Sequence, residues 1–238
     1  MELLILVLLS VVQSIIGVGV LLFGTPVFLM LGYDFFEVLI LLLPISITVS
    51  VSTVLHAGVR GVTPAGIILL TFTIAIGTWF ALERSIDILT LLVGLSLVFS
   101  SLLHFARSDA LTNSFAKDEK VAMPVIGIIH GFTNQGGALL LWWSGVKTSD
   151  KNEARSLVAF SYGLMASIQL ATVLLVDGPR VFRAFEVMNL IVPLLSYIAG
   201  SIMFARVPGE RYRDITNLFV GGVGMIILTK VFTEYNDL

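Results

Sequence analysis

The chain contains no cysteine and has few charged residues, which make up 13% of its 238 residues. The absence of cysteine excludes disulfides, thiolate metal sites and thiol nucleophiles. The 14 Lys and Arg are matched by 16 Asp and Glu, so no basic field indicates nucleic-acid binding. The sequence also lacks a phosphate-binding loop of the Gly-x-x-x-x-Gly-Lys type, which gives it no nucleotide-binding motif of that kind.

Apolar sequence is what the chain has in abundance: 57% of its residues are hydrophobic and the mean hydropathy is +0.99. This composition indicates an all-α polytopic integral membrane protein, because lipid leaves no water for the backbone and no segment alternates like a barrel strand. The first residues lack the positive region of a secretory signal, so we expect the first segment to be retained. Apolar segments fall at about 2–31, 36–57, 62–82, 86–106, 121–146, 154–176, 184–205 and 214–233.

Two of these segments are interrupted by a polar, glycine-containing stretch. The first stretch runs over residues 13–26, and a similar one recurs 117 residues later, over 130–143. We interpret this as an internal repeat: residues 1–106 form the first half, 107–120 a polar linker and 121–238 the second half. The alternative is chance coincidence in a chain with 21 glycines. Matching interruptions in two halves are a known pointer to the substrate site of a transporter.

The two interrupted segments are too long for one span and too short for two. They cover 2–31 and 121–146, whereas one crossing needs about 20 residues and two need about 40. An arm over residues 2–16 would reach about 22 Å, short of the roughly 30 Å hydrocarbon thickness. We therefore predict two re-entrant hairpins, each followed by three transmembrane helices.

The distribution of Lys and Arg favours the hairpins. If all eight segments crossed once, the cations would divide seven against seven. With hairpins they divide ten against four, a normal positive-inside asymmetry. Three crossings in each half turn the second half upside down, which gives two inverted repeats. This topology predicts a protein of the cell (inner) membrane with both termini outside the cytoplasm.

At these stretches the sequence resembles the TauE/SafE family of sulfite-exporter-like permeases. The family pattern is Gly-x-Gly-Gly-Gly with a proline five residues later, in each half. The residues that match are Gly17, Gly19, Pro26, Gly136 and Gly137, and those that depart from it are Val20, Leu21, Asn134, Ala138 and Trp143. The turn over residues 56–61 and the two-half layout extend the likeness over nearly the whole chain. The resemblance implies movement of a small sulfur-containing or organic anion such as sulfite or sulfoacetate.

Candidate substrate-binding residues lie mainly at the two interruptions. Glycines let the backbone approach a ligand, exposed N–H groups at a helix start suit an anion, and amide and hydroxyl side chains can donate hydrogen bonds. The alternative for the glycines is close helix packing. The candidates are Gln13, Gly17, Gly19, Thr25, His130, Thr133, Asn134, Gln135, Gly136, Gly137 and Gln169.

Further polar residues have two interpretations each. His130 could exchange a coupling proton, or it could be a neutral ring bonded to a carbonyl. Gln169 shares a helical face with Tyr162 and could line the site, and Ser46, Ser50 and Thr53 share a face of the second segment. No Lys or Arg lies at the centre of an apolar segment. We expect Trp142 and Trp143 at the membrane interface, and we expect the turn over residues 149–155, which includes Arg155, to be a solvated cytoplasmic anchor with a helix start at Asn152.

The leading hypothesis is therefore a secondary transporter of a small anion, without a cofactor and without enzymatic activity. Expected partners are the anion, the lipid bilayer, a coupling proton or other ion and, as one option, a second copy of the chain. An intramembrane enzyme is the first alternative, but the sequence has no HExxH pair, Gly-x-Ser-x-Gly elbow or intramembrane aspartate pair. A non-transporting assembly subunit is the second, and it would leave the polar interruptions unexplained.

Overall fold

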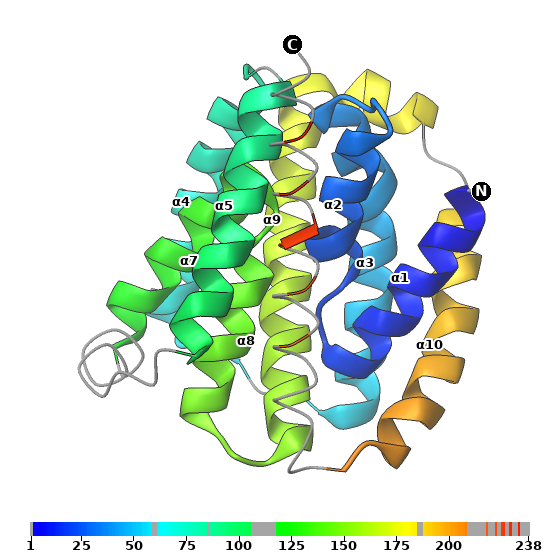
Figure 1. Ribbon diagram of the computed structural model, residues 1–238, viewed down its shortest axis with the longest axis vertical. Coiled ribbons are helices and arrows are strands. Elements are labelled where there is room, and N and C mark those ends of the chain that lie inside the picture. Colours follow the sequence, from blue (N-terminus) through cyan, green and yellow to red (C-terminus); the bar gives the residue numbers. More distant parts are fainter. Residues whose placement is uncertain are drawn as a thin grey trace.

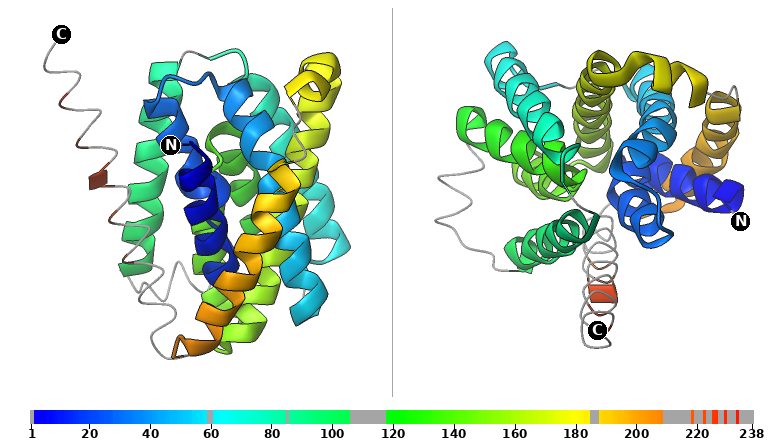
Figure 2. Two further views of the ribbon diagram at one scale, coloured as in Figure 1. Left: turned by 90° about the vertical axis from the view of Figure 1, so that its right-hand side faces the viewer. Right: turned by 90° about the horizontal axis from the view of Figure 1, so that it is seen from above.

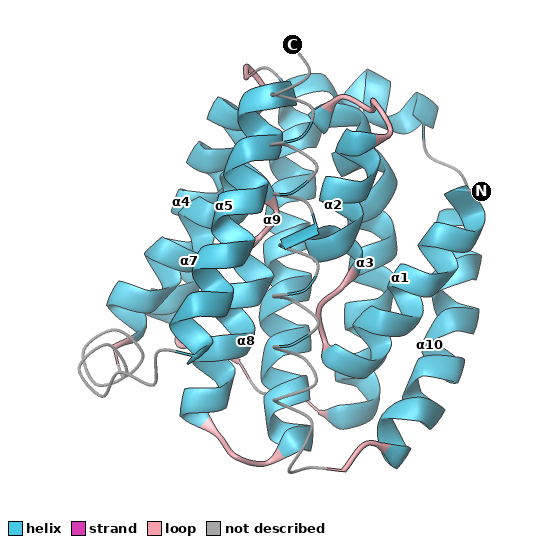
Figure 3. Cartoon of the chain, viewed as in Figure 1, coloured by secondary structure: helices cyan, strands magenta, loops and turns pink. Residues whose placement is uncertain are grey.

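The computed structural model describes residues 2–58, 61–84, 86–105, 118–184 and 188–208, together with residues 218, 222, 225, 226, 229 and 233. Within these residues the chain is helical and contains no strand (Figure 3), so the all-α class is confirmed. The helices are α1 (Glu2–Ile16), α2 (Val20–Met30), α3 (Phe35–Ala57), α4 (Pro64–Ala81), α5 (Ile86–Phe105), α7 (Glu119–Thr133), α8 (Gly136–Lys147), α9 (Lys151–Ala184) and α10 (Met188–Arg206).

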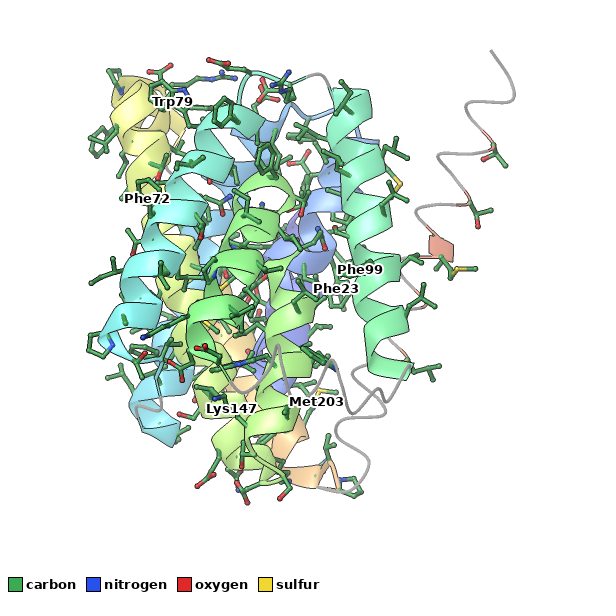
Figure 4. All side chains as sticks on the ribbon, turned by 90° about the vertical axis from the view of Figure 1, so that its left-hand side faces the viewer. Phe23, Phe72, Trp79, Phe99, Lys147 and Met203 are labelled. Atoms are coloured by element: carbon green, nitrogen blue, oxygen red, sulfur yellow. The ribbon has the colours of Figure 1, made fainter. Side chains whose placement is uncertain are left out.

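Three of the described helices are long and apolar enough to cross a membrane: Phe35–Ala57, Pro64–Ala81 and Lys151–Phe182. Their length and composition indicate association with a membrane. Large apolar side chains cover the outside of the bundle, as Figure 4 shows for Phe72 and Trp79, which are 66% and 54% exposed and point away from α4. Such a surface is typical of helices that face lipid.

The two interrupted segments each consist of two helices. The first breaks between Ile16 and Val20 and the second between Thr133 and Gly136. In Figure 1, α1 runs down and α2 runs up, whereas α7 runs up and α8 runs down, and the side view in Figure 2 agrees. The first hairpin therefore opens toward the upper end of the molecule and the second toward the lower end, and the breaks lie between these ends.

Local sequence explains where the long helices begin. Asp34 accepts a hydrogen bond from the Glu37 N–H at 2.8 Å, and the Glu37 carboxylate accepts one from the Asp34 N–H at 3.0 Å, which is a capping box at the start of α3. Thr63 caps α4, whose first residue is Pro64. Asp150 caps α9 by accepting from the N–H groups of residues 152 and 153.

A polar cluster ties together the upper ends of α1, α3 and α9. The Tyr33 hydroxyl donates a hydrogen bond to the Glu2 carboxylate at 2.5 Å, and this bond raises the pKa of Tyr33 above its ordinary value. Arg180 donates to the Asp34 carboxylate at 3.0 Å and lies over the ring of Phe36. These contacts join the open end of the first hairpin and the start of α3 to the C-terminal part of α9.

The structure shows where α9 begins and where its helical backbone breaks. The segments expected over 154–176 and 184–205 are α9, which starts at Lys151 and continues to Ala184, and α10, which starts at Met188. Asp177 has φ −149° and ψ 69°, so the helical backbone is broken there and resumes for less than two full turns. The linker expected over 107–120 lies outside the described residues up to 117, and most of the segment expected over 214–233 also lies outside them.

Glycine residues let α7 of the second hairpin pack closely against α4. A Cβ added at Gly131 of α7 would lie 2.6 Å from the Ile74 carbonyl oxygen and 2.9 Å from the Gly77 Cα, both in α4. Only glycine permits this approach, because any side chain would displace the neighbouring backbone. The contact fixes α7, and with it the tip of the second hairpin, against a membrane-length helix.

Candidate functional site

The break in the first hairpin requires its two glycines. Gly17 has φ +92°, a conformation that residues with a side chain rarely adopt, and its N–H ends α1 by donating to the Gln13 carbonyl at 2.7 Å. A Cβ at Gly19 would lie 2.7 Å from the Gln13 nitrogen. Both predicted site glycines therefore shape the turn, and Gly19 brings the start of α2 back against the end of α1.

Gln13 holds this turn together through its side-chain amide. Its Nε2 donates to the Ser46 carbonyl at 2.8 Å and to Ser50 Oγ at 3.1 Å, both on α3. Its Oε1 accepts the N–H of Val20 at 3.0 Å, at the first residue of α2. Protein groups therefore already form hydrogen bonds with this amide. The serine face predicted on the second segment supplies two of them, Ser46 and Ser50.

Tyr162 of α9 bonds a second N–H group at the N-terminus of α2. Its hydroxyl accepts the N–H of Leu22 at 2.9 Å. Sequence reasoning placed Tyr162 on a polar stripe but assigned the functional role to Gln169, seven residues further along. The only sequence signal for the Tyr162 contact was its position on that shared helical face.

The break in the second hairpin is built from an amide residue in place of a glycine. Asn134 has φ +62° and ψ 8°, the left-handed conformation that asparagine tolerates better than most residues, and its N–H donates to the His130 carbonyl at 2.8 Å. Thr133 is satisfied locally, because its hydroxyl donates to the Ile129 carbonyl at 2.6 Å and accepts the Gln135 N–H at 3.2 Å.

The start of α8 is packed tightly but has no side-chain cap. A Cβ at Gly136 would lie 2.5 Å from the His130 Cβ and 2.6 Å from the Ile126 carbonyl oxygen. A Cβ at Gly137 would lie 2.7 Å from the Tyr162 ring. The first N–H groups of a helix have no intrahelical partner, and at α8 the Ala138 N–H already donates to the Gln135 carbonyl at 3.1 Å, so the donors that the α8 N-terminus can offer are those of Gly136 and Gly137.

The tip of the second hairpin touches α2 of the first hairpin. Asn134 Nδ2 donates a hydrogen bond of 2.8 Å to Thr25 Oγ1, and both residues are completely buried. The His130 ring lies edge-on to the Tyr162 ring, with centroids 5.8 Å apart. The structure therefore brings together the predicted residues of both interruptions, with Tyr162 between them. Among the described residues the Gln169 amide has no hydrogen-bond partner, so no such bond joins it to this group. It lies two turns beyond Tyr162 on the same face of α9.

Several polar atoms of this region are buried and, among the described residues, have no hydrogen-bond partner. Leaving such a group unpaired costs about 1–3 kcal/mol, so each one calls for a bound molecule or a change of state. The side chains concerned are completely buried. The atoms are His130 Nδ1 and Nε2, Asn134 Oδ1, Gln135 Oε1, and Gln169 Oε1 and Nε2.

Arg155 corrects the prediction of a solvated turn. It is 6% exposed, and its guanidinium donates to the Ser14 carbonyl near the end of α1 and to Ser201 Oγ of α10 at 3.2 Å. It also lies over the Phe204 ring, 4.1 Å from the centroid. A cation is thus buried beside the first hairpin tip, where none was predicted.

The two tryptophans of α8 are also buried, with Trp142 9% and Trp143 1% exposed, so the prediction of interfacial rings is wrong. Trp143 forms the inner wall of a pocket of about 190 Å³ at the lower end of α8, where the Lys147 ammonium lies 5.3 Å from its ring centroid. Figure 4 shows Lys147 at this end of the helix. The pocket is lined by Gly61, Glu119, Trp143, Lys147, Thr148, Glu153 and Leu157.

Within the part of the chain that the structure describes, no three His, Asp or Glu side chains gather as metal ligands do. Comparison with models of protein families, with curated proteins and with solved structures finds no match to this chain.

Proposed function

We propose that this chain is a secondary transporter of a small anion, with its substrate site at the uncapped N-terminus of α8. The observation that carries the proposal is the contact of the second hairpin's tip with α2 of the first, through Asn134 and Thr25, in a region with unpaired, fully buried polar atoms. A helix N-terminus carries about half a positive charge, which stabilises a nearby anion where water is excluded.

The difference between the two hairpins selects α8. At α2, the N–H groups of Val20 and Leu22 already donate to Gln13 and Tyr162. At α8, the N-cap residue Gln135 makes no side-chain cap, and its Oε1 lacks a partner. The side chains that would surround an anion at α8 are those of Asn134, Gln135 and His130, all completely buried, and of these the Gln135 amide nitrogen already donates to the Thr133 carbonyl at 3.1 Å.

The amide of Asn134 suits a ligand of either hydrogen-bonding type. Thr25 has a hydroxyl, which can donate or accept, so Asn134 can meet it with its nitrogen or, after a half-turn of the amide, with its oxygen. The second orientation leaves two amide hydrogens for an oxyanion. Sulfur oxyanions and sulfonates, the substrates that the TauE/SafE resemblance implies, carry several acceptor oxygens for such donors.

The opposite directions of the two hairpins support an alternating-access mechanism. In two inverted repeats, each hairpin would reach the common site from its own side of the membrane, and a relative movement of the halves would expose the site to one side at a time. The halves are then residues 1–106 and 121–238, in the cell membrane with both termini outside the cytoplasm.

Uptake into proteoliposomes tests the proposal. We would compare sulfite, sulfoacetate, taurine, sulfate and acetate, with Gln135→Ala and Asn134→Gly as site variants and Ser52→Ala as control, because Ser52 bonds its own helix at the Thr48 carbonyl. We expect saturable uptake of at least one sulfur-containing anion that falls at least tenfold in both site variants and is unchanged in the control. Absence of flux for every anion, from protein that unfolds cooperatively, would refute transport.

A further inference from the structure

We propose that His130 binds one proton together with the anion, so that the transported species is an anion plus a proton. The inference rests on the proposed function and names its coupling ion. The geometry behind it is a histidine that is completely buried, adjoins the α8 N-terminus and has both ring nitrogens without a hydrogen-bond partner among the described residues.

The position of His130 is fixed by its neighbours. Gly136, the first residue of α8, packs against it so closely that an added Cβ would lie 2.5 Å from the His130 Cβ. The Tyr162 ring holds the other side at 5.8 Å. A ring placed this way has the same positive helix end beside it that the anion site uses.

Among the side chains that the structure describes, few other ionisable groups face His130. Of the helices packed against α7, α4 carries no titratable residue, and α9 presents the Tyr162 phenol, whose hydroxyl accepts the Leu22 N–H. The remaining ionisable residues of α7, α8 and α5 stand in the first or last turn of their helices, away from the tip. They are Glu119 and Lys120 of α7, Lys147 of α8, and Asp87 and His104 of α5.

Electrostatics makes the two ligands depend on each other. A protonated imidazole beside the α8 N-terminus is repelled by the helix dipole, and an anion alone leaves an unbalanced charge in a region of low dielectric constant. When the anion and the proton are both present, each stabilises the other. By linkage, the factor by which the anion strengthens proton binding equals the factor by which the proton strengthens anion binding.

The proton balance of the cycle follows. The imidazole nitrogen that carries the lone pair takes a proton from water on the side where the site is open, and the anion binds with it. After the site opens to the other side, the anion leaves and the same nitrogen returns the proton to water there. For a monovalent anion, no net charge crosses the membrane.

The test uses purified full-length protein and methanesulfonate, a strong-acid anion that takes up no proton between about pH 5 and 8, where histidine titrates. Calorimetry in two buffers of different ionisation enthalpy counts the protons taken up per anion bound. We expect close to one proton per anion in the wild type at neutral pH and fewer than about 0.1 in His130→Gln. His56→Gln is the matched control, because His56 is exposed at the end of α3.

The outcomes separate this inference from the proposed function. Binding without proton uptake in the wild type would overturn the inference and leave the anion site standing. Proton uptake that persists in His130→Gln would also overturn it. If no anion of the flux panel is transported and methanesulfonate does not bind, the proposed function fails as well. The wild-type proton count alone decides the matter if His130→Gln does not fold.

Discussion

Asn134 and Thr25, 109 residues apart in the sequence, are joined by a hydrogen bond of 2.8 Å between the tip of the second hairpin and the middle of α2 in the first, and the two hairpins open toward opposite ends of the molecule. The bond lies close to the start of α8 but in the middle of α2. The predictions below concern this bond, the packing of the helices around it and the direction in which they cross the membrane.

The bond between Asn134 and Thr25 should be measurable as a coupling energy. Asn134→Gly keeps the left-handed turn but loses the bond, whereas Asn134→Ala loses the bond and adds about 1–2 kcal/mol of backbone strain. We expect Ala to be less stable than Gly. In a double-mutant cycle with Thr25→Val, thermal unfolding in detergent should give a coupling of about 1 kcal/mol. Additive effects of the two substitutions would mean that the bond does not contribute to stability.

Gln13 is predicted to stabilise the fold before it serves any ligand. Gln13→Leu removes the bonds to Ser46 and Ser50 and leaves the buried Val20 N–H without its side-chain acceptor, so the free energy of unfolding should fall by about 1–3 kcal/mol. Ser52→Ala is the control and should change it by less than about 0.5 kcal/mol. If Gln13→Leu unfolds like the wild type but loses anion binding, the side chain binds the anion and does not stabilise the fold.

Close packing of α4 against α7 should not tolerate a methyl group. Gly131→Ala places a Cβ within 3 Å of two backbone atoms of α4, and overpacking of this kind costs about 1–3 kcal/mol. Gly178→Ala is the matched control, because the nearest atom to its added Cβ is 4.0 Å away. Differential scanning fluorimetry of the two variants compares them directly. Equal melting temperatures would show that α4 and α7 are further apart than described.

Arg155 should control the mobility of the first hairpin. Arg155→Met removes its hydrogen bond to the Ser14 carbonyl, and hydrogen bonds from charged donors contribute about 1.5–3 kcal/mol. We expect faster amide hydrogen exchange over residues 14–19 in this variant and a smaller effect in Arg155→Lys. Arg206→Gln, which alters an exposed arginine at the end of α10, should leave exchange there unchanged. Unchanged exchange in Arg155→Met would contradict the described contact.

The direction of the helices can be tested by labelling, because the chain has no cysteine of its own. Glu83→Cys and Asn152→Cys place single thiols at exposed positions at opposite ends of the molecule. The proposed topology puts residue 83 outside and residue 152 inside the cell. An impermeant maleimide added to intact cells should label only the first. Labelling of both, or of residue 152 alone, would reject this orientation.

Hydropathy sufficed to predict the helical class, because a backbone without water must satisfy its own hydrogen bonds. The places where the two long segments break also coincide with the polar stretches around Gly17 and Asn134, since glycine and asparagine adopt the left-handed backbone that ends a helix there. The division into repeats remains a prediction, as does the membrane orientation.

The contacts that complete the site were beyond sequence reasoning. Arg155 follows a polar turn and looks solvated in sequence, but packing of α1 and α10 over the start of α9 buries it. Tyr162 reaches Leu22 across 140 positions, which no local pattern reports. The same holds for Trp143, which is covered only once α7, α8 and α9 are assembled. Pairings of this kind depend on tertiary arrangement and not on periodicity.

The bond of the Tyr162 hydroxyl to α2 affects the number of anions that the proposed transporter would bind. Two similar hairpins would be expected to offer two equivalent sites, one at the N-terminus of α2 and one at that of α8. At α2, however, the Gln13 amide and the Tyr162 hydroxyl already accept the N–H groups of Val20 and Leu22. For the proposed transporter we therefore expect one anion per chain. Removing the phenolic oxygen would free an amide at α2 and change a one-to-one binding isotherm into one with a second, weaker step.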